Sequence, residues 1–216
     1  MAKRSARSVF AGVPNYAYDK RLHNYVDLST GRMVSRSVIV DALRDFINSR
    51  DLVLENLSEM YANGILSREE FYVAFTNEVA NSYKAAAALS QGGWHNLTPS
   101  HWGKVGRELR DEYQRIVNFI DDIDNGRYID TDGNMQIAAI RNRAVAYNSS
   151  AYGMFWRLKD EEMMNDDAIT EERWWAILDE TTCERCARFH AMGWQPKGTF
   201  PPPPLHPSCR CGKSYR

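Results

Sequence analysis

Cysteines and long apolar runs are absent from most of this sequence. No cysteine precedes position 183 in a chain of 216 residues. No apolar stretch approaches the roughly 20 residues that a membrane-spanning helix requires, so no membrane contact is expected. The opening Met1-Ala2-Lys3-Arg4 continues into polar and basic residues rather than an apolar run, and a secretory signal peptide is therefore not expected. We expect folding in a reducing cytoplasm, where disulfide bonds are rare.

Motifs of common enzyme sites are absent as well. The sequence has no Gly-x4-Gly-Lys-Ser/Thr phosphate loop, no Gly-x-Gly-x2-Gly dinucleotide motif and no Gly-x-Ser-x-Gly nucleophile turn. The aspartates between Asp121 and Asp132 lack the glycine and the closing glutamate of a calcium loop, and we interpret them as a solvated helix end. We therefore expect that the protein is not an enzyme.

Charge of both signs is present, but it is unevenly distributed. The net charge is −1, and 44% of the residues are hydrophobic, as in a globular protein. Residues 1–36 carry seven Lys and Arg against two acids, residues 183–216 carry six against one, and the residues between them carry fourteen against twenty-five. Basic ends on an acidic body suggest contacts with nucleic acid or an acidic protein surface, although solvated tails would give the same pattern.

Apolar residues recur at three- and four-residue spacing from position 35 to position 167, which predicts a helical bundle. Polar, proline- and glycine-containing turns separate the predicted helices. The first two helices are expected from Ser35, with Val38 on the apolar face, and from Leu52 to Tyr61, with an end at Asn63-Gly64. The other three are expected from a capping box at Ser67 to Gly92, from Thr98-Pro99 to Gly126, and from about Met135 to Met163.

The predicted fold class is mainly α, with three parts. Residues 1–34 are expected to form a basic extended arm that needs a partner surface to become ordered. Residues 35–167 are expected to form the bundle. Residues 168–216 are expected to form a small zinc-stabilised α+β or loop module, since they are too polar and proline-rich to be held together by apolar burial alone.

All four cysteines lie in the last thirty-four residues, as two close pairs. Two pairs of thiols brought together by a loop can surround one Zn²⁺ tetrahedrally, with four sulfurs or with three sulfurs and an imidazole. We favour a structural zinc site over two disulfides or free thiols, and over a catalytic zinc, because no open coordination position is implied. Four of five groups are expected to bind, and spacing does not decide which: Cys183, Cys186, His206, Cys209 and Cys211.

The run Trp174 to Leu178 is short and apolar, which predicts a strand leading to the first cysteine pair. Its two tryptophans are placed to pack the helices against the metal module. His190 is a weaker ligand candidate, and Met192 stands where a zinc deaminase would need its glutamate.

The C-terminal residues resemble the signature of phage head morphogenesis proteins, the minor head protein family typified by phage Mu. The resemblance lies in Trp175-x3-Asp179-x3-Cys183-x2-Cys186 followed by Pro-Pro-Leu-His206-Pro-x-Cys209-Arg210-Cys211. Arg141-x-Arg143-Ala144 is also similar to the run-in of that family. The clear resemblance covers about residues 165–212.

This resemblance implies a virion or assembly component. It implies association with the portal protein or the major capsid protein, in several copies, at the phage head or head–tail junction, after synthesis in the host cytoplasm. The basic ends would then contact packaged DNA without sequence specificity. A zinc-ribbon nucleic-acid-binding protein and a portal-associated connector or adaptor protein remain alternatives.

Overall fold

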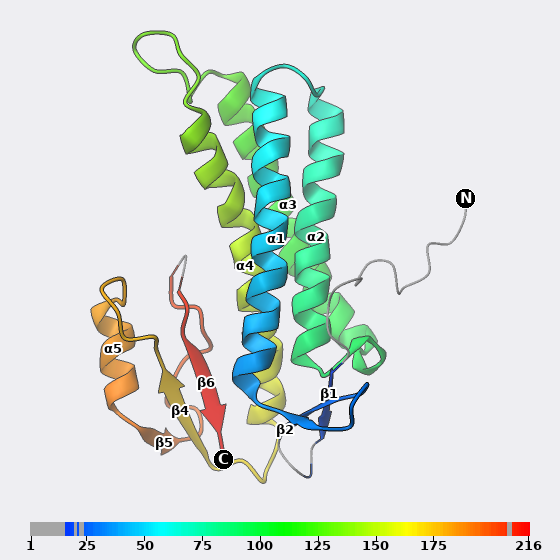
Figure 1. Cartoon of the computed structure of the whole chain (residues 1–216), viewed down its shortest axis with the longest axis vertical. Helices are drawn as coiled ribbons and strands as arrows, with labels where there is room; N and C mark the ends of the chain where they lie inside the picture. Colours follow the sequence, from blue (N-terminus) through cyan, green and yellow to red (C-terminus); the bar gives the residue numbers. More distant parts are fainter. Residues whose placement is uncertain (1–15, 20, 22–23, 207–208) are drawn as a thin grey trace.

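In the computed structural model, the described residues are 16–19, 21, 24–206 and 209–216. Four long helices form an elongated bundle, and two small sheets lie at one end of it (Figure 1). The mainly α prediction is confirmed. Within the described ranges, no helix is both long and apolar enough to cross a membrane.

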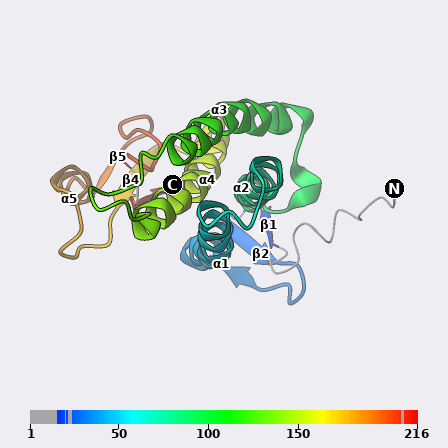
Figure 2. The same cartoon turned by 90° about the horizontal axis from the view of Figure 1, so that it is seen from above.

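The bundle is built around its last helix. It comprises α1 (Arg36–Ala62), α2 (Arg68–Ser90), α3 (Pro99–Asp124) and α4 (Ile137–Met164). Helix α4 packs along α1 and α2, and α2 also packs against α3. Viewed along the bundle, α1 and α3 lie on opposite sides (Figure 2).

The first two predicted helical segments are one continuous helix, α1. The polar residues between them do not interrupt it because neighbouring helices provide their partners. Arg50 pairs with Glu78 of α2 at 3.2 Å, and Asp51 accepts a hydrogen bond from Asn148 of α4 at 2.7 Å. A helix therefore continues through a polar stretch whose side chains are satisfied by tertiary contacts.

Local signals placed the helix ends correctly. The predicted capping box is present: the Ser67 hydroxyl accepts from the Glu70 amide, and the Glu70 carboxylate accepts from the Ser67 amide at 2.9 Å. Thr98 caps α3, with Pro99 at its first position. Gly64 follows α1 at φ +70°, a conformation that glycine adopts without strain.

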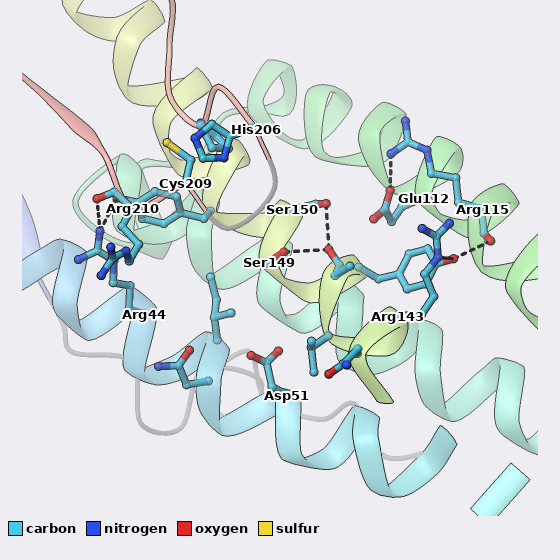
Figure 3. Close-up of a pocket in the computed structure, with 18 of the residues that line it drawn as sticks. Arg44, Asp51, Glu112, Arg115, Arg143, Ser149, Ser150, His206, Cys209 and Arg210 are labelled. Carbon is cyan, nitrogen blue, oxygen red and sulfur yellow. Dashed lines mark hydrogen bonds and ion pairs between the residues drawn. The ribbon is translucent and has the colours of Figure 1, made fainter. Parts of the chain in front are cut away.

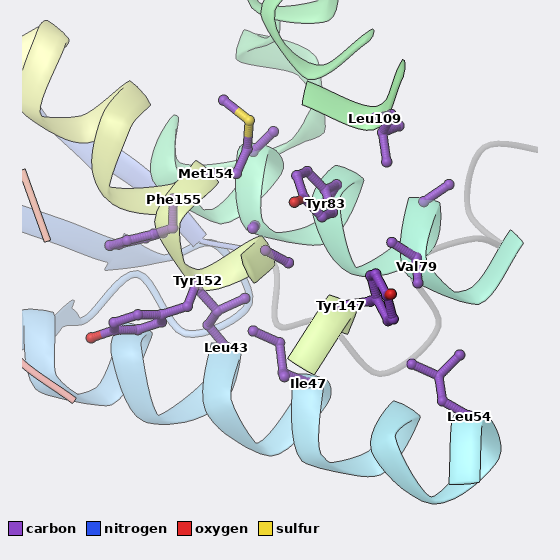
Figure 4. Close-up of a cluster of buried hydrophobic side chains, with 14 of the residues drawn as sticks. Leu43, Ile47, Leu54, Val79, Tyr83, Leu109, Tyr147, Tyr152, Met154 and Phe155 are labelled. Carbon is purple, nitrogen blue, oxygen red and sulfur yellow. The ribbon is translucent and has the colours of Figure 1, made fainter. Parts of the chain in front are cut away.

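The bundle core is apolar and rich in aromatic rings (Figure 4). Phe75 of α2 packs edge-on against Tyr147 of α4, with ring centroids 5.9 Å apart. Val38 was expected on the apolar face of α1 but is 43% exposed. The buried face follows Ile39 and Leu43, and Val38 lies about 100° around the helix from its neighbour Ile39.

The described part of the predicted N-terminal arm is folded onto the bundle, which corrects the prediction of a partner-dependent arm. β1 (Tyr16–Asp19), β2 (Asn24–Asp27) and β3 (Met33–Val34) form an antiparallel sheet. Within it, the Tyr25 side chain is 1% exposed, and its hydroxyl donates to the carbonyl of Ser90 at the end of α2. Residues 1–15 of the predicted arm lie outside the described residues.

In the C-terminal module, β4 (Glu171–Trp175), β5 (Trp194–Pro196) and β6 (Gly212–Tyr215) form a second three-stranded antiparallel sheet, in the order β5-β4-β6. The predicted strand at Trp174–Leu178 is shifted: the structure has it earlier, and Ile177 and Leu178 are 40% and 62% exposed. A short helix, α5 (Glu184–Ala191), lies between β4 and β5 in the chain.

Two adjacent tryptophans of β4 point to opposite faces, as side chains alternate along a strand. Trp174 packs inside the module against Phe189, with centroids 5.4 Å apart. Trp175 packs edge-on against Trp156 of α4, with centroids 6.4 Å apart. The expectation that this pair joins the helices to the module therefore holds for Trp175, whereas Trp174 packs within the module.

Gly212 of β6 leaves the space that this aromatic contact needs. A Cβ atom there would lie 2.6 Å from the Trp156 ring and closer still to Trp175. We expect Gly212→Ala to lower the free energy of unfolding by about 1–3 kcal/mol, the usual cost of overpacking. Urea denaturation followed by tryptophan fluorescence would measure it.

The matched control is Gly106→Ala in α3, where an added Cβ meets no atom within 4 Å. That change should leave stability equal or slightly higher, because alanine favours helix. Equal destabilisation by the two substitutions would contradict the proposed close packing at Gly212.

Candidate metal centre

The first cysteine pair lies at the start of α5. Cys183 is the N-cap residue, and its sulfur accepts a hydrogen bond from the Cys186 amide at 3.4 Å. Cys186 follows in the first helical turn. The Cys183 sulfur therefore lies beside the amides at the helix N-terminus, which favour its thiolate form.

The second group of ligand candidates comes from the segment that leads into β6. Cys186 Sγ lies 3.8 Å from Cys209 Sγ and 3.8 Å from His206 Nε2. A tetrahedral zinc ion with Zn–S bonds of about 2.3 Å places its sulfur ligands about 3.8 Å apart. The Cys186–Cys209 spacing fits two sulfur ligands of one ion.

Five candidate groups form two overlapping trios that share Cys186. One trio is Cys183, Cys186 and His206, and the other is Cys186, Cys209 and Cys211; within each, the ligand atoms lie within 4.8 Å of one another. All four cysteines are free thiols. The predicted convergence of these residues on a potential metal site is confirmed. A cavity of about 20 Å³ lies among them, enough for one small occupant.

The weaker candidate, His190, has a different contact. Its Nδ1 accepts a hydrogen bond from the Ala176 amide at 3.0 Å, which ties α5 to the segment after β4. Neither trio includes it. We therefore assign His190 a structural contact rather than a ligand position.

The thiols affect one another's protonation. The pKa of Cys209 is lowered to about 5 because the Cys211 thiol donates a hydrogen bond to it. The pKa of Cys183 is lowered by the hydrogen bond that its sulfur accepts from the Cys186 amide. Burial raises the pKa of Cys186 to about 12, and the bond to Cys209 raises the pKa of Cys211. The arrangement shares protons among closely packed sulfurs, and a divalent cation would replace those protons and stabilise every thiolate.

An ion pair connects the two halves of the cysteine motif. Arg210, which lies between Cys209 and Cys211, donates to both carboxylate oxygens of Asp179 at 2.6 Å and also to the Thr181 hydroxyl. The Arg210 guanidinium holds the pKa of the Asp179 carboxyl well below its usual range. This contact fixes the chain before the first cysteine to the chain beside the last.

Two bundle residues bind the backbone of the second cysteine pair. Arg44 of α1 donates to the carbonyl of Arg210, and Tyr152 of α4 donates to the carbonyl of Cys211 at 3.1 Å. Neither contact has a signal in the sequence, because a single arginine and a single tyrosine on predicted helices form no distinguishing pattern. The candidate metal centre is thus anchored to α1 and α4 as well as to its own module.

A buried charge network makes a further connection between the module and the bundle. Lys213 of β6 and Glu172 of β4 are both fully buried and pair at 2.6 Å. Lys213 also pairs with Asp160 of α4, and the Tyr215 hydroxyl donates to the same carboxylate at 2.7 Å. Charges removed from water need such partners. These pairs depend on contacts that form only in the folded protein, so no sequence motif marks them.

Comparison of the chain with protein families, curated proteins and solved structures gives no match. The resemblance to phage head morphogenesis proteins therefore rests on the motif residues of the C-terminal module.

Proposed function

We propose that the chain is a structural minor capsid protein of a phage head, which assembles with the portal protein or the major capsid protein. The observation that carries the proposal is that the motif residues have linked positions in space. The two cysteine-containing halves converge, the Asp179–Arg210 pair joins them, and Trp175 docks the module on α4.

The donor set supports zinc as the ion at this centre. Thiolates and imidazole suit Zn²⁺, whereas Mg²⁺ and Ca²⁺ prefer oxygen ligands. Four protein ligands would leave no position for a catalytic water, so we assign the ion a structural role. It would supply the stability that the small apolar core of the module, around Trp174 and Phe200, provides only in part.

The basic end of the chain supports a contact with DNA or an acidic protein surface. Arg185 and Arg188 are exposed on α5, and no carboxylate pairs with either among the described residues. Phosphate contacts of this kind carry no sequence information and weaken as salt concentration rises. The same arginines are the feature that favours the alternative, a zinc-ribbon nucleic-acid-binding protein.

Particle composition tests the proposal. In the phage that encodes this chain, quantitative mass spectrometry of purified procapsids and virions is expected to find the protein at a fixed ratio to portal. A deletion of its gene should reduce the yield of filled heads, and a plasmid copy should restore it. Absence of the protein from both kinds of particle would reject the structural role and leave the nucleic-acid-binding alternative.

A further inference from the structure

A groove runs along α4 between α1 and α3, and the metal module closes one end of it (Figure 3). Its volume is about 750 Å³. The end wall is formed by Pro204, Leu205 and His206. Because His206 also belongs to the candidate metal cluster, the same fold that gathers the cysteines builds this wall.

The floor of the groove carries small side chains. Val145, Ala146, Ser149 and Ser150 line it from α4. The Ser149 hydroxyl donates to the Ala146 carbonyl at 2.9 Å, so it is already satisfied within the helix. A floor of this kind lets another helix approach to the interaxial distance of about 8–10 Å that close packing requires.

The charge along the groove is positive. Arg44 and Arg210 lie at the module end, and Arg115 and Arg143 lie toward the other end (Figure 3). The two acidic groups in the lining are engaged. Asp51 accepts from Asn148 at 2.7 Å, and Glu112 is 2% exposed and pairs with Arg115 at 2.7 Å. Three of the four guanidinium groups have a carboxylate partner: Arg210 pairs with Asp179, Arg115 with Glu112, and Arg44 with Asp41 at 3.6 Å. Arg143 donates to the Tyr147 hydroxyl and pairs with no carboxylate among the described residues. The lining still carries four arginines against two acids, and this excess, with Arg143 open to a new partner, favours an anionic occupant.

The same lining favours a peptide over a single-stranded nucleic acid. Proteins that bind single strands offer exposed aromatic rings on which bases stack. The aromatic residues of this groove, Tyr147 and Tyr152, are only 4% and 6% exposed. Small aliphatic side chains and arginines remain, and these match a helix that bears acidic residues on its flanks.

We infer that this groove docks an acidic amphipathic helix of a partner protein, with the small residues of that helix facing α4. The inference rests on the proposed function, since the partner would be a component of the assembling head. The occupant would pack between α1 and α3 and extend the bundle by one helix. Arg143 would contact its carboxylates at the end away from the module.

A designed pair of peptides tests this inference on the zinc-loaded full chain. The probe is a fluorescein-labelled, alanine-based helix of about 18 residues, or five turns, with glutamates flanking an alanine ridge. Its matched control carries lysine at every glutamate position. Fluorescence anisotropy is expected to give at least tenfold tighter binding of the acidic peptide, and the preference should shrink as salt concentration rises.

Three variants locate the binding. Ser149→Trp fills the floor and should abolish binding of the acidic peptide. Arg143→Glu is a surface change that should weaken the acidic peptide about tenfold and strengthen the lysine peptide. Arg110→Glu makes the same change in charge at an exposed position of α3 that does not line the groove, and it should leave both affinities unchanged.

Equal affinities for the two peptides would overturn the inference, as would equal effects of Arg143→Glu and Arg110→Glu. If an oligothymidylate binds more tightly than the acidic peptide, and Ser149→Trp abolishes that binding, the groove is a nucleic-acid site instead. A dimer in light scattering that Ser149→Trp dissociates would assign it to a second copy of this chain. None of these outcomes changes whether the protein is found in particles, so the proposed function is tested separately.

Discussion

Replacing Cys186 with serine is expected to unfold the C-terminal module and leave the bundle helical. Cys186 belongs to both trios of candidate ligands, and its sulfur lies 3.8 Å from Cys209 and from His206. Structural zinc sites contribute an apparent binding free energy on the order of 10 kcal/mol. The module has a small apolar core, so most of its stability should depend on the ion.

Elemental analysis should give about one zinc per chain for the unchanged protein and much less for Cys186→Ser. Hydrogen exchange should become fast in residues 168–216 and stay slow in α1, α2 and α4. The matched control is His190→Gln, because His190 lies outside both trios; zinc content should not change. A folded, zinc-free module in the unchanged protein would contradict the prediction.

The same measurements on two further variants decide whether His206 or Cys183 is the group that does not bind. Cys183 and His206 belong only to the first trio, whereas Cys209 and Cys211 belong only to the second. If four sulfurs hold the ion, His206→Ala keeps the zinc and Cys183→Ser loses it. If His206 replaces Cys183, the two results are reversed.

The helices were predictable because their signals are local. The Ser67 capping box needs only a glutamate three residues later, and Thr98-Pro99 starts α3 through its own side chain and ring. The interior polar stretch of α1 was misread as a break because its partners, Glu78 and Asn148, belong to other helices. Periodicity identifies a helix well but cannot include contacts that form only after packing.

The N-terminal sheet could not be predicted for a related reason. Its strands contain only two to four residues, which is too short for an alternating pattern to stand out. What fixes it is distant in sequence: Tyr25 reaches Ser90 of α2, and the Lys159 ammonium of α4 lies 5.0 Å from the tyrosine ring. Tyrosines spread along a basic segment gave no indication of these partners.

The ligand candidates were predictable because few residue types bind zinc, and this chain gathers its thiols in one segment. The groups that hold the candidate ligands in place were not predictable. Arg44 and Tyr152 contact main-chain carbonyls, which have no sequence signature. Lys213 resembles any surface lysine in the sequence, although it is fully buried in the structure.

Lys213→Met is expected to lower the free energy of unfolding by about 3–5 kcal/mol, the usual cost of removing one partner from a buried ion pair. Lys213 and Glu172 are both 0% exposed and lie 2.6 Å apart. The methionine would leave the Glu172 carboxylate buried and close to Asp160 with no cation between them. The loss should separate β6 from α4, because Lys213 is the group that pairs with both β4 and α4.

Urea denaturation of the zinc-loaded protein measures the effect, and Arg216→Met provides the matched control. Arg216, the residue after β6, pairs with Glu171 of β4 at 2.6 Å, but its side chain is 57% exposed, so its loss should cost less than about 1 kcal/mol. The double variant Lys213→Met with Glu172→Gln should recover part of the lost stability, because it removes the uncompensated carboxylate along with the lysine. Equal costs for Lys213→Met and Arg216→Met would instead mean that water reaches the pair, and that burial of these charges does not hold the module against α4.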